Sequence, residues 1–292
     1  MSRIFSAFLL LSLASLLCFA QSPEMRMQFY AQERGEAAPP VPQARPVIPP
    51  PRFEPTCSFG LGLSSRYVRE GWCENPSMVS VMQAEVSESG LYMGVTGTYN
   101  FSGTAGRRRH FQDDRFYMGY ALGFTNTGVM GPVVVDLCWT YNGYPGESEE
   151  NSGSLSMSFL LNEIWQIGRF ALTGAFTLEH NYGKNATFAL TDATLVYSVT
   201  EDGSWQWANS LMLYWGDTRK LRRMTDGMVG GNAFYTAAWR SSLTWNVNGT
   251  WSVEPFVQTD MHPDSRSRDA ARDDAFNSAV TFLGGIRLNC HF

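Results

Sequence analysis

The last twelve residues of the chain alternate between two kinds of side chain along their whole length. One face carries Phe282, Gly284, Ile286, Leu288, Cys290 and Phe292. The residues between them include Arg287 and Asn289, which make the other face more polar. A repeat of two is the repeat of a β-strand, in which successive side chains point to opposite sides. The segment therefore predicts a strand with one apolar face that ends on an aromatic residue.

The same alternation recurs from residue 56 onward. It predicts twelve strands, at about 56–67, 78–87, 90–100, 115–125, 132–142, 153–162, 170–180, 187–199, 205–215, 235–247, 251–260 and 281–292. Most have the ~10 residues that a tilted strand needs to cross a bilayer. Short turns are expected at 87–90, 126–128, 200–203 and 248–250, and long polar loops at 68–77, 101–114, 143–152, 181–186, 216–233 and 262–278. An even strand number with this rhythm predicts an all-β fold, a closed antiparallel transmembrane β-barrel with both ends of the chain in the periplasm.

Composition favours a membrane barrel over a soluble β-sandwich or lipocalin-like barrel, which would alternate in the same way. Aromatic residues make up 14% of the chain and charged residues only 17%. A soluble fold would have to bury in one core the tryptophans that a membrane barrel places at its two interfaces. These tryptophans are Trp205, Trp207, Trp215, Trp239, Trp245 and Trp251.

The first 55 residues differ from the rest. Residues 1–20 combine a cationic start, an apolar stretch and a small-residue cleavage site, and are expected to be a removable signal peptide rather than an uncleaved anchor. Residues 21–55 are rich in proline and lack periodicity, which predicts a disordered periplasmic linker. The barrel is expected to span 56–292. Two roles remain open for this linker. It could be a plain spacer, or it could bind a periplasmic partner.

Two resemblances follow from these residues. The terminal strand, with Ile286, Leu288, Cys290 and Phe292, resembles the signal that the assembly machinery of bacterial outer-membrane barrels reads. Residues 65–100, above all the segment 88–95, resemble the TorF-type porin family. That family usually closes its first strand with Arg-Gly, whereas this chain has Arg69-Glu70-Gly71. The resemblance implies an outer-membrane barrel with a pore function.

Strand parity places a set of charged side chains inside the barrel. These are Arg66, Asp136, Glu179, Asp192, Arg240, Glu254, Asp260 and Arg287. Five acids against three bases predict a porin-like channel for passive passage of small hydrophilic solutes with a weak preference for cations. The alternative is a structural or adhesive barrel in which these charges pair and plug the lumen.

An enzyme is the less favoured alternative, because some outer-membrane barrels hydrolyse lipids. His180 is the histidine placed at a lipid-facing rim, but a hydrolase also needs a nucleophile beside such a base. No serine stands two residues away, so we expect no enzymatic activity and read His180 as an interfacial aromatic. His291 is expected in the lumen or at the periplasmic rim.

The expected surroundings are outer-membrane lipid, lipopolysaccharide, the barrel-assembly machinery and small solutes. Two basic clusters in the long loops could meet lipopolysaccharide phosphates: Arg107-Arg108-Arg109-His110 and Arg219-Lys220-Leu221-Arg222-Arg223. Solvated loop charge balanced by nearby aspartates is an equal alternative. A net charge of -5 argues against nucleic acid as a partner.

Four cysteines remain after the signal peptide: Cys57, Cys73, Cys138 and Cys290. Their spacing matches no metal motif, and no cofactor is expected. Closing the barrel brings the first strand beside the last, with Cys57 and Cys290 near the same rim. The sequence therefore predicts that these two form a disulfide across the closure. It leaves the pairing of Cys73 and Cys138 open.

Overall fold

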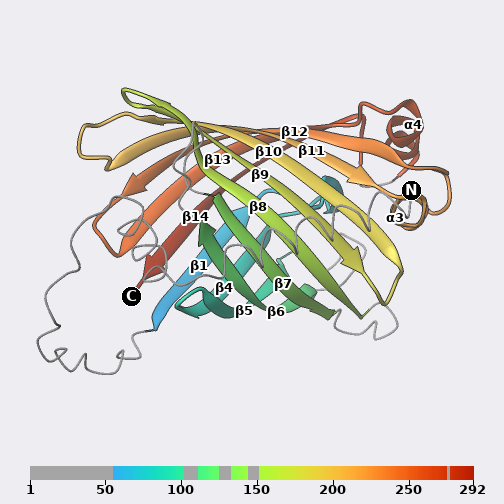
Figure 1. Cartoon of the computed structure of the whole chain (residues 1–292). Coiled ribbons are helices and arrows are strands. Elements are labelled where there is room, and N and C mark those ends of the chain that lie inside the picture. Colours follow the sequence, from blue (N-terminus) through green and yellow to red (C-terminus); the bar gives the residue numbers. More distant parts are fainter. Residues whose placement is uncertain (1–54, 102–110, 125–132, 144–150, 275–276) are drawn as a thin grey trace, which may run out of the picture. The chain divides into compact units, whose positions relative to one another are not determined.

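The structure is a computed structural model that describes residues 55–101, 111–124, 133–143, 151–274 and 277–292. The expected signal peptide, nearly all of the expected linker, the turn at 126–128 and the basic cluster at 107–110 lie outside these residues. Within them, twelve antiparallel strands form a closed barrel, as the alternation predicts (Figure 1). In chain order they are β1 (Thr56–Ser64), β4 (Val79–Glu88), β5 (Leu91–Asn100), β6 (Phe111–Phe124), β7 (Val133–Gly143), β8 (Ser152–Ile167), β9 (Phe170–Asn181), β10 (Ala186–Ser198), β11 (Trp205–Gly216), β12 (Ala233–Asn246), β13 (Trp251–Met261) and β14 (Val280–His291).

The barrel closes where β1 pairs with β14. The backbone N–H of Cys57 donates to the carbonyl of Phe292 at 3.1 Å, and the N–H of Phe292 donates to the carbonyl of Cys57 at 2.8 Å. This register places Cys290 opposite Phe59, two positions from Cys57. Both cysteines are free thiols, so the predicted Cys57–Cys290 disulfide is not formed. Diagonal neighbours in a sheet lie ~7–8 Å apart, beyond the usual reach of a disulfide.

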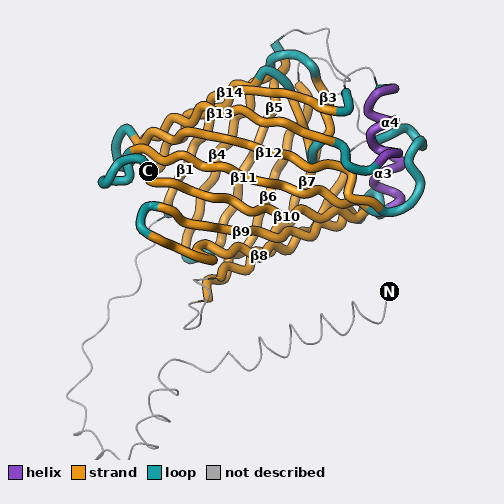
Figure 2. The backbone as a smooth tube through the Cα atoms, turned by 90° about the horizontal axis from the view of Figure 1, so that it is seen from above, coloured by secondary structure: helices purple, strands orange, loops and turns teal. Residues whose placement is uncertain are grey.

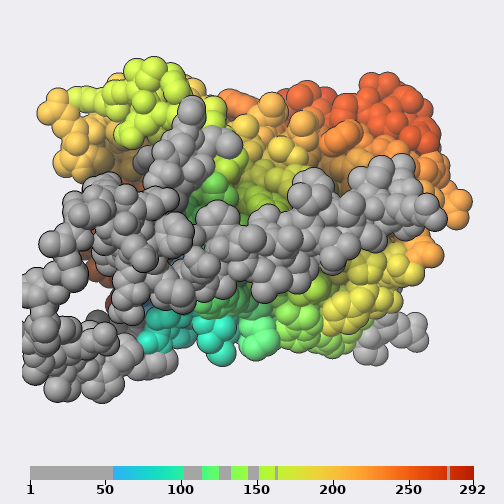
Figure 3. Space-filling view, viewed as in Figure 1, coloured from blue at the N-terminus to red at the C-terminus, as the bar shows by residue number. Residues whose placement is uncertain are grey.

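The outward faces of the strands are apolar and exposed. On β5, Leu91, Met93 and Val95 are 57%, 47% and 51% exposed. The same holds on β4, whose faces the sequence leaves unassigned, because Met82 and Val86 are exposed there. In Figure 3, teal, green and yellow segments of this outer surface follow one another along the lower edge of the view. No helix among the described residues is long and apolar enough to cross a bilayer.

The two ends of the barrel differ (Figure 2). One end, the turn end, carries the short connections, such as Ser89-Gly90 between β4 and β5, together with the start of β1 and the end of β14. The other, the loop end, carries α3 (Thr218–Met224), α4 (Ser265–Asp273) and a small sheet of β2 (Tyr67–Arg69) and β3 (Trp72–Asn75). Ser89 and Gly90 both have positive φ, 49° and 87°, which matches the twist of a two-residue hairpin.

Several elements depart from the predicted pattern, among them β8, the loop at 68–77 and the start of β12. Strand β8 continues to Ile167 instead of ending near 162, with a register shift between Leu161 and Trp165. The predicted polar loop at 68–77 contains the hairpin of β2 and β3. Tyr235, predicted on the outward face of its strand, is fully buried.

A β-bulge explains the position of Tyr235. On β12, Thr236 pairs with Tyr214 while Phe234 pairs with Trp215, so Tyr235 is the extra residue. A bulge shifts the alternation by one residue. Phe234 is therefore 57% exposed on the outer face, whereas Tyr235 and Thr236 are both buried.

Candidate functional site: the barrel lumen

The hairpin of β2 and β3 turns into the lumen at the loop end. Its tip, Glu70-Gly71, has positive φ at both residues, 51° and 77°. The tip contacts β12: the Tyr235 hydroxyl donates to the carbonyl of Glu70 at 2.9 Å, and the Thr236 hydroxyl donates to the carbonyl of Gly71 at 3.1 Å. Lys220 of α3 forms an ion pair with the Glu70 carboxylate. The bulge at Tyr235 thus supplies an attachment point for a loop that the sequence predicts to be external.

A buried apolar cluster lies beside this hairpin at the loop end of the barrel. It joins Trp72 of β3, Leu221 of α3 and Ala270 and Ala271 of α4 to side chains of three barrel strands. The barrel members are Phe188, Tyr214, Tyr235 and Ala238. We call this assembly of hairpin, α3 and α4 the cap. It occupies the β10–β12 side of the loop end.

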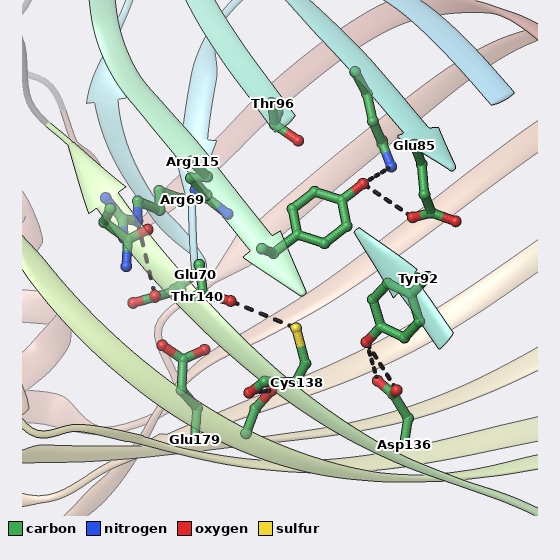
Figure 4. A pocket seen from close by; sticks show the side chains of 14 residues that line it. Arg69, Glu70, Glu85, Tyr92, Thr96, Arg115, Asp136, Cys138, Thr140 and Glu179 are labelled. Atoms are coloured by element: carbon green, nitrogen blue, oxygen red, sulfur yellow. Dashed lines mark hydrogen bonds and ion pairs between the residues drawn. The ribbon is translucent and has the colours of Figure 1, made fainter. Parts of the chain in front are cut away.

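A cavity of about 300 Å³ lies on the other side of the lumen (Figure 4). Its acids are Glu70, Glu85, Asp136 and Glu179, and its bases are Arg69 and Arg115. The acids come from β4, β7, β9 and the hairpin tip, so the hairpin faces the barrel wall across the cavity. We call it the acidic cavity.

Two tyrosines lie along the wall of the acidic cavity. The Tyr92 hydroxyl donates to the carboxylate of Asp136, 2.8 and 2.9 Å from its two oxygens, and the Tyr117 hydroxyl donates to Glu85 at 3.0 Å (Figure 4). Tyr92 pairs across the sheet with Gly119. Between the same two strands, Tyr117 of β6 pairs with Gly94 of β5.

The two glycines make room for the two rings. A Cβ atom on Gly94 would overlap the Tyr117 ring, and one on Gly119 would overlap the Tyr92 ring. Because glycine has no side chain, each ring can lie against the backbone of the neighbouring strand. The glycines therefore hold two large side chains against the wall instead of in the lumen.

A second cavity of about 330 Å³ adjoins the first, because Gln83, Thr96 and Arg115 line both. Its charged lining consists of Arg66, Arg115, Arg240 and Arg287, and we call it the arginine cavity. Arg240 forms an ion pair with Glu254 at 2.8 Å. The guanidinium carbon of Arg240 also lies 3.9 Å from the centre of the Phe256 ring, as in a cation–π contact.

The predicted lumen charges divide between these sites. Arg66, Arg240 and Arg287 line the arginine cavity, and Asp136 and Glu179 line the acidic cavity. Glu254 reaches the arginine cavity only through its ion pair with Arg240. Two further acids line neither cavity. Asp192 accepts from the Thr194 hydroxyl at 2.9 Å, and buried Asp260 accepts from the Gln258 amide at 2.9 Å.

Sequence reasoning missed several residues of the acidic cavity. Arg115 follows the parity of its strand and could have been found by extending the alternation one residue before Phe116. Glu85 lies on β4, where the alternation is too irregular to indicate which side chains face inward. Arg69 and Glu70 carried no such signal, because nothing local indicates that their loop turns inward.

The remaining histidine candidates lie elsewhere. His180 is exposed on β9, and its Nδ1 lies 3.0 Å from the Thr187 hydroxyl, its cross-strand partner on β10. His291 pairs with Ser58 near the closure. Neither lines one of the two cavities.

Comparisons with known proteins show distant structural similarity to outer-membrane porins and channels. No protein-family model and no curated protein matches the sequence. The KdgM porin aligns at 7% identity and a TM-score of 0.46, covering 81% of this chain and 99% of the porin. The NanC porin aligns at 10% identity and 0.43, covering 79% and 97%. An outer-membrane channel from Pseudomonas putida F1 aligns at 10% identity and 0.47, covering 86% and 100%. At this level of similarity, a neighbour's activity says nothing about this chain, and the TorF-type resemblance stays a prediction.

We expect Gly119→Ala to destabilise the barrel by about 1–3 kcal/mol, because the added methyl overpacks against the Tyr92 ring and the carbonyl oxygen of Leu137. Urea unfolding of the refolded protein, followed by tryptophan fluorescence, measures the change. Gly123→Ala is the matched control. Gly123 lies on the same strand as Gly119, and a Cβ atom added to it would meet no other atom within 4 Å. Part of the Gly119→Ala cost should disappear when Tyr92 is also alanine. An equal loss of stability in both glycine variants would contradict the packing of the Tyr92 ring against Gly119.

The cap should loosen in acid through His262. The Nδ1 of His262 lies 2.8 Å from the Tyr235 carbonyl, and burial lowers the pKa of this histidine below its usual 6.5. A histidine with a lowered pKa contributes stability that is present above about pH 6.5 and is lost as the pH falls, because the unfolded segment takes up the proton first. We therefore expect weaker hydrogen-exchange protection of residues 262–274 at pH 5 than at pH 7.5, after correction for intrinsic exchange. His262→Asn should remove this pH dependence of the protection. If the protection of residues 262–274 still depends on pH in that variant, a group other than His262 causes the effect.

Proposed function

We propose that this chain is a porin-like channel of the bacterial outer membrane that lets small hydrophilic solutes pass passively, with a mild preference for cations. The observation that carries the proposal is the inverted polarity of the barrel. Large apolar side chains are exposed on its outside, and charged side chains surround two cavities on its inside. A water-soluble domain is built the other way round.

The outer surface supports a membrane environment. Water-soluble proteins rarely expose contiguous apolar patches larger than a few hundred Å². Here apolar residues are exposed on strand after strand around the barrel. A closed sheet is also the form in which strands can cross a bilayer, because it leaves no edge without hydrogen-bond partners.

We place the turn end in the periplasm and the loop end outside the cell. Short periplasmic turns and longer outer loops are the usual arrangement in such barrels. The partners that follow are outer-membrane lipid, lipopolysaccharide near the exposed arginines of α3, and the assembly machinery acting on the strand that ends at Phe292. We propose no nucleic-acid partner and no enzymatic activity.

The lumen supports passage past the cap. The cap fills the β10–β12 side, whereas the acidic cavity and the arginine cavity lie beside it and adjoin each other. Spaces of this size fit small solutes and their water. Among the described residues, four acids against two bases line the acidic cavity and favour cations along that wall.

The competing function is a structural or adhesive barrel with a plugged lumen. The buried apolar cluster of the cap favours it, because a fully packed core at one end would obstruct flow. Discrete ion conductance separates the two functions directly.

Planar-bilayer recording of the refolded protein should show discrete conductance steps, with a reversal potential in a KCl gradient that is weakly cation-selective. Glu179→Gln should reduce that selectivity, because it removes an acid from the lumen. Glu201→Gln is the matched control, since its side chain is 89% exposed in the turn between β10 and β11. Silent membranes containing folded protein would support the plugged barrel instead.

A further inference from the structure

We infer that the arginine cavity is a binding site for the carboxylate groups of anionic solutes. This inference deepens the proposed channel function, and its meaning for transport rests on that function. It adds a site of defined chemistry beside the acidic cavity, whose charge is opposite.

The described lining of the arginine cavity is basic. Four guanidinium groups reach it, from Arg66, Arg115, Arg240 and Arg287, and among the described residues no aspartate or glutamate lines it. Arg240 is paired with Glu254. Within the part of the chain that the structure describes, Arg66 and Arg287 form no ion pair with a carboxylate. Among the described residues, Arg66 and Arg287 therefore bring positive charge to the cavity that no ion pair balances.

Two of these arginines are held close together by one aromatic ring. The guanidinium carbons of Arg240 and Arg287 lie 3.9 and 5.6 Å from the centre of the Phe256 ring. Phe256 is fixed in turn over Gly285, where a Cβ would leave no room for the ring. Two like charges held near each other repel, and a bound anion relieves that repulsion. Glu254 offsets part of this repulsion through its ion pair with Arg240, and an anionic ligand would offset more of it.

The chemistry of the cavity points to carboxylate. Glu254 already supplies one carboxylate to Arg240, at 2.8 Å, and so shows that the group fits this part of the lumen. In the sheet register Glu254 lies directly opposite Arg287, and the Arg287 guanidinium forms no ion pair with a carboxylate of the described residues. A guanidinium presents its N–H groups as a fork that matches the two oxygens of a carboxylate. A solute carboxylate at Arg287 and Arg66 would complete the pairing that Glu254 begins.

The position of the cavity makes the site accessible to a solute in the channel. It adjoins the acidic cavity through Gln83, Thr96 and Arg115, so the two walls carry opposite charge across one lumen. Small cations would follow one wall while carboxylates bind at the other. A weak overall preference for cations and a carboxylate site are therefore compatible.

Calorimetric titration of citrate into the refolded barrel in uncharged detergent tests the site without requiring conduction. We expect wild-type binding, and a loss of roughly tenfold in affinity in Arg287→Gln, the size expected for one charge-assisted contact. Arg287→Lys should fall in between, because it keeps the charge but loses the fork. Arg66→Gln is a second test variant outside the barrel strands, where folding is less at risk. Arg169→Gln is the matched control, because Arg169 pairs with Glu201 in the turns at the other end.

The outcomes separate this site from the channel itself. Citrate binding that is absent in the wild type, or equally strong in Arg287→Gln and Arg66→Gln, would overturn the inference. Equal affinity for inorganic phosphate would overturn its restriction to carboxylates. Binding by a barrel that does not conduct would leave the site standing and remove the channel, whereas conduction without citrate binding would do the reverse.

Discussion

The pairing of β1 with β14 is the interaction on which the rest of the molecule depends. It begins with the two reciprocal backbone hydrogen bonds between Cys57 and Phe292 and continues to Ser65 and Gly284. Without it the sheet would have two edges of unpaired N–H and C=O groups, each costing several kcal/mol in hydrocarbon. Closure also fixes which side of every strand faces inward. The apolar exterior and the charged lumen both follow from that single choice.

Within the closed wall, side-chain packing divides the lumen. The bulge at Tyr235 anchors the tip of the β2–β3 hairpin, and the cap built on it fills the β10–β12 side. Glycines at 94 and 119 hold the two tyrosines against the opposite wall. What remains is an acidic cavity beside an arginine cavity. Selectivity in such a lumen depends on where charges lie, and a simple count of acids and bases describes it poorly.

Periodicity in the sequence predicts the barrel because the repeat of two residues is a local property of each strand. It places Phe282 outward and Arg287 inward without knowledge of any partner. Features set by contacts between distant segments were not predictable in this way. The bulge at Tyr235 looks like regular alternation, the inward turn of Glu70 depends on β12, and the Tyr92–Gly119 pair depends on register. The register also sets Cys57 and Cys290 two positions apart, which keeps the predicted disulfide from forming. The sequence alone does not reveal this offset.

Disulfide trapping across the closure tests the account most directly. Ser58 and His291 face each other across β1 and β14, next to the hydrogen-bonded pair of Cys57 and Phe292. With the native cysteines replaced by serine, Ser58→Cys combined with His291→Cys should form an intramolecular disulfide nearly completely in the folded barrel, identified by mass spectrometry of the linked peptides. Ser58→Cys with Arg287→Cys is the control, because Arg287 pairs with Gly62 and lies four positions away. Failure of the first pair to cross-link, or equal cross-linking of both pairs, would contradict a barrel closed in this register.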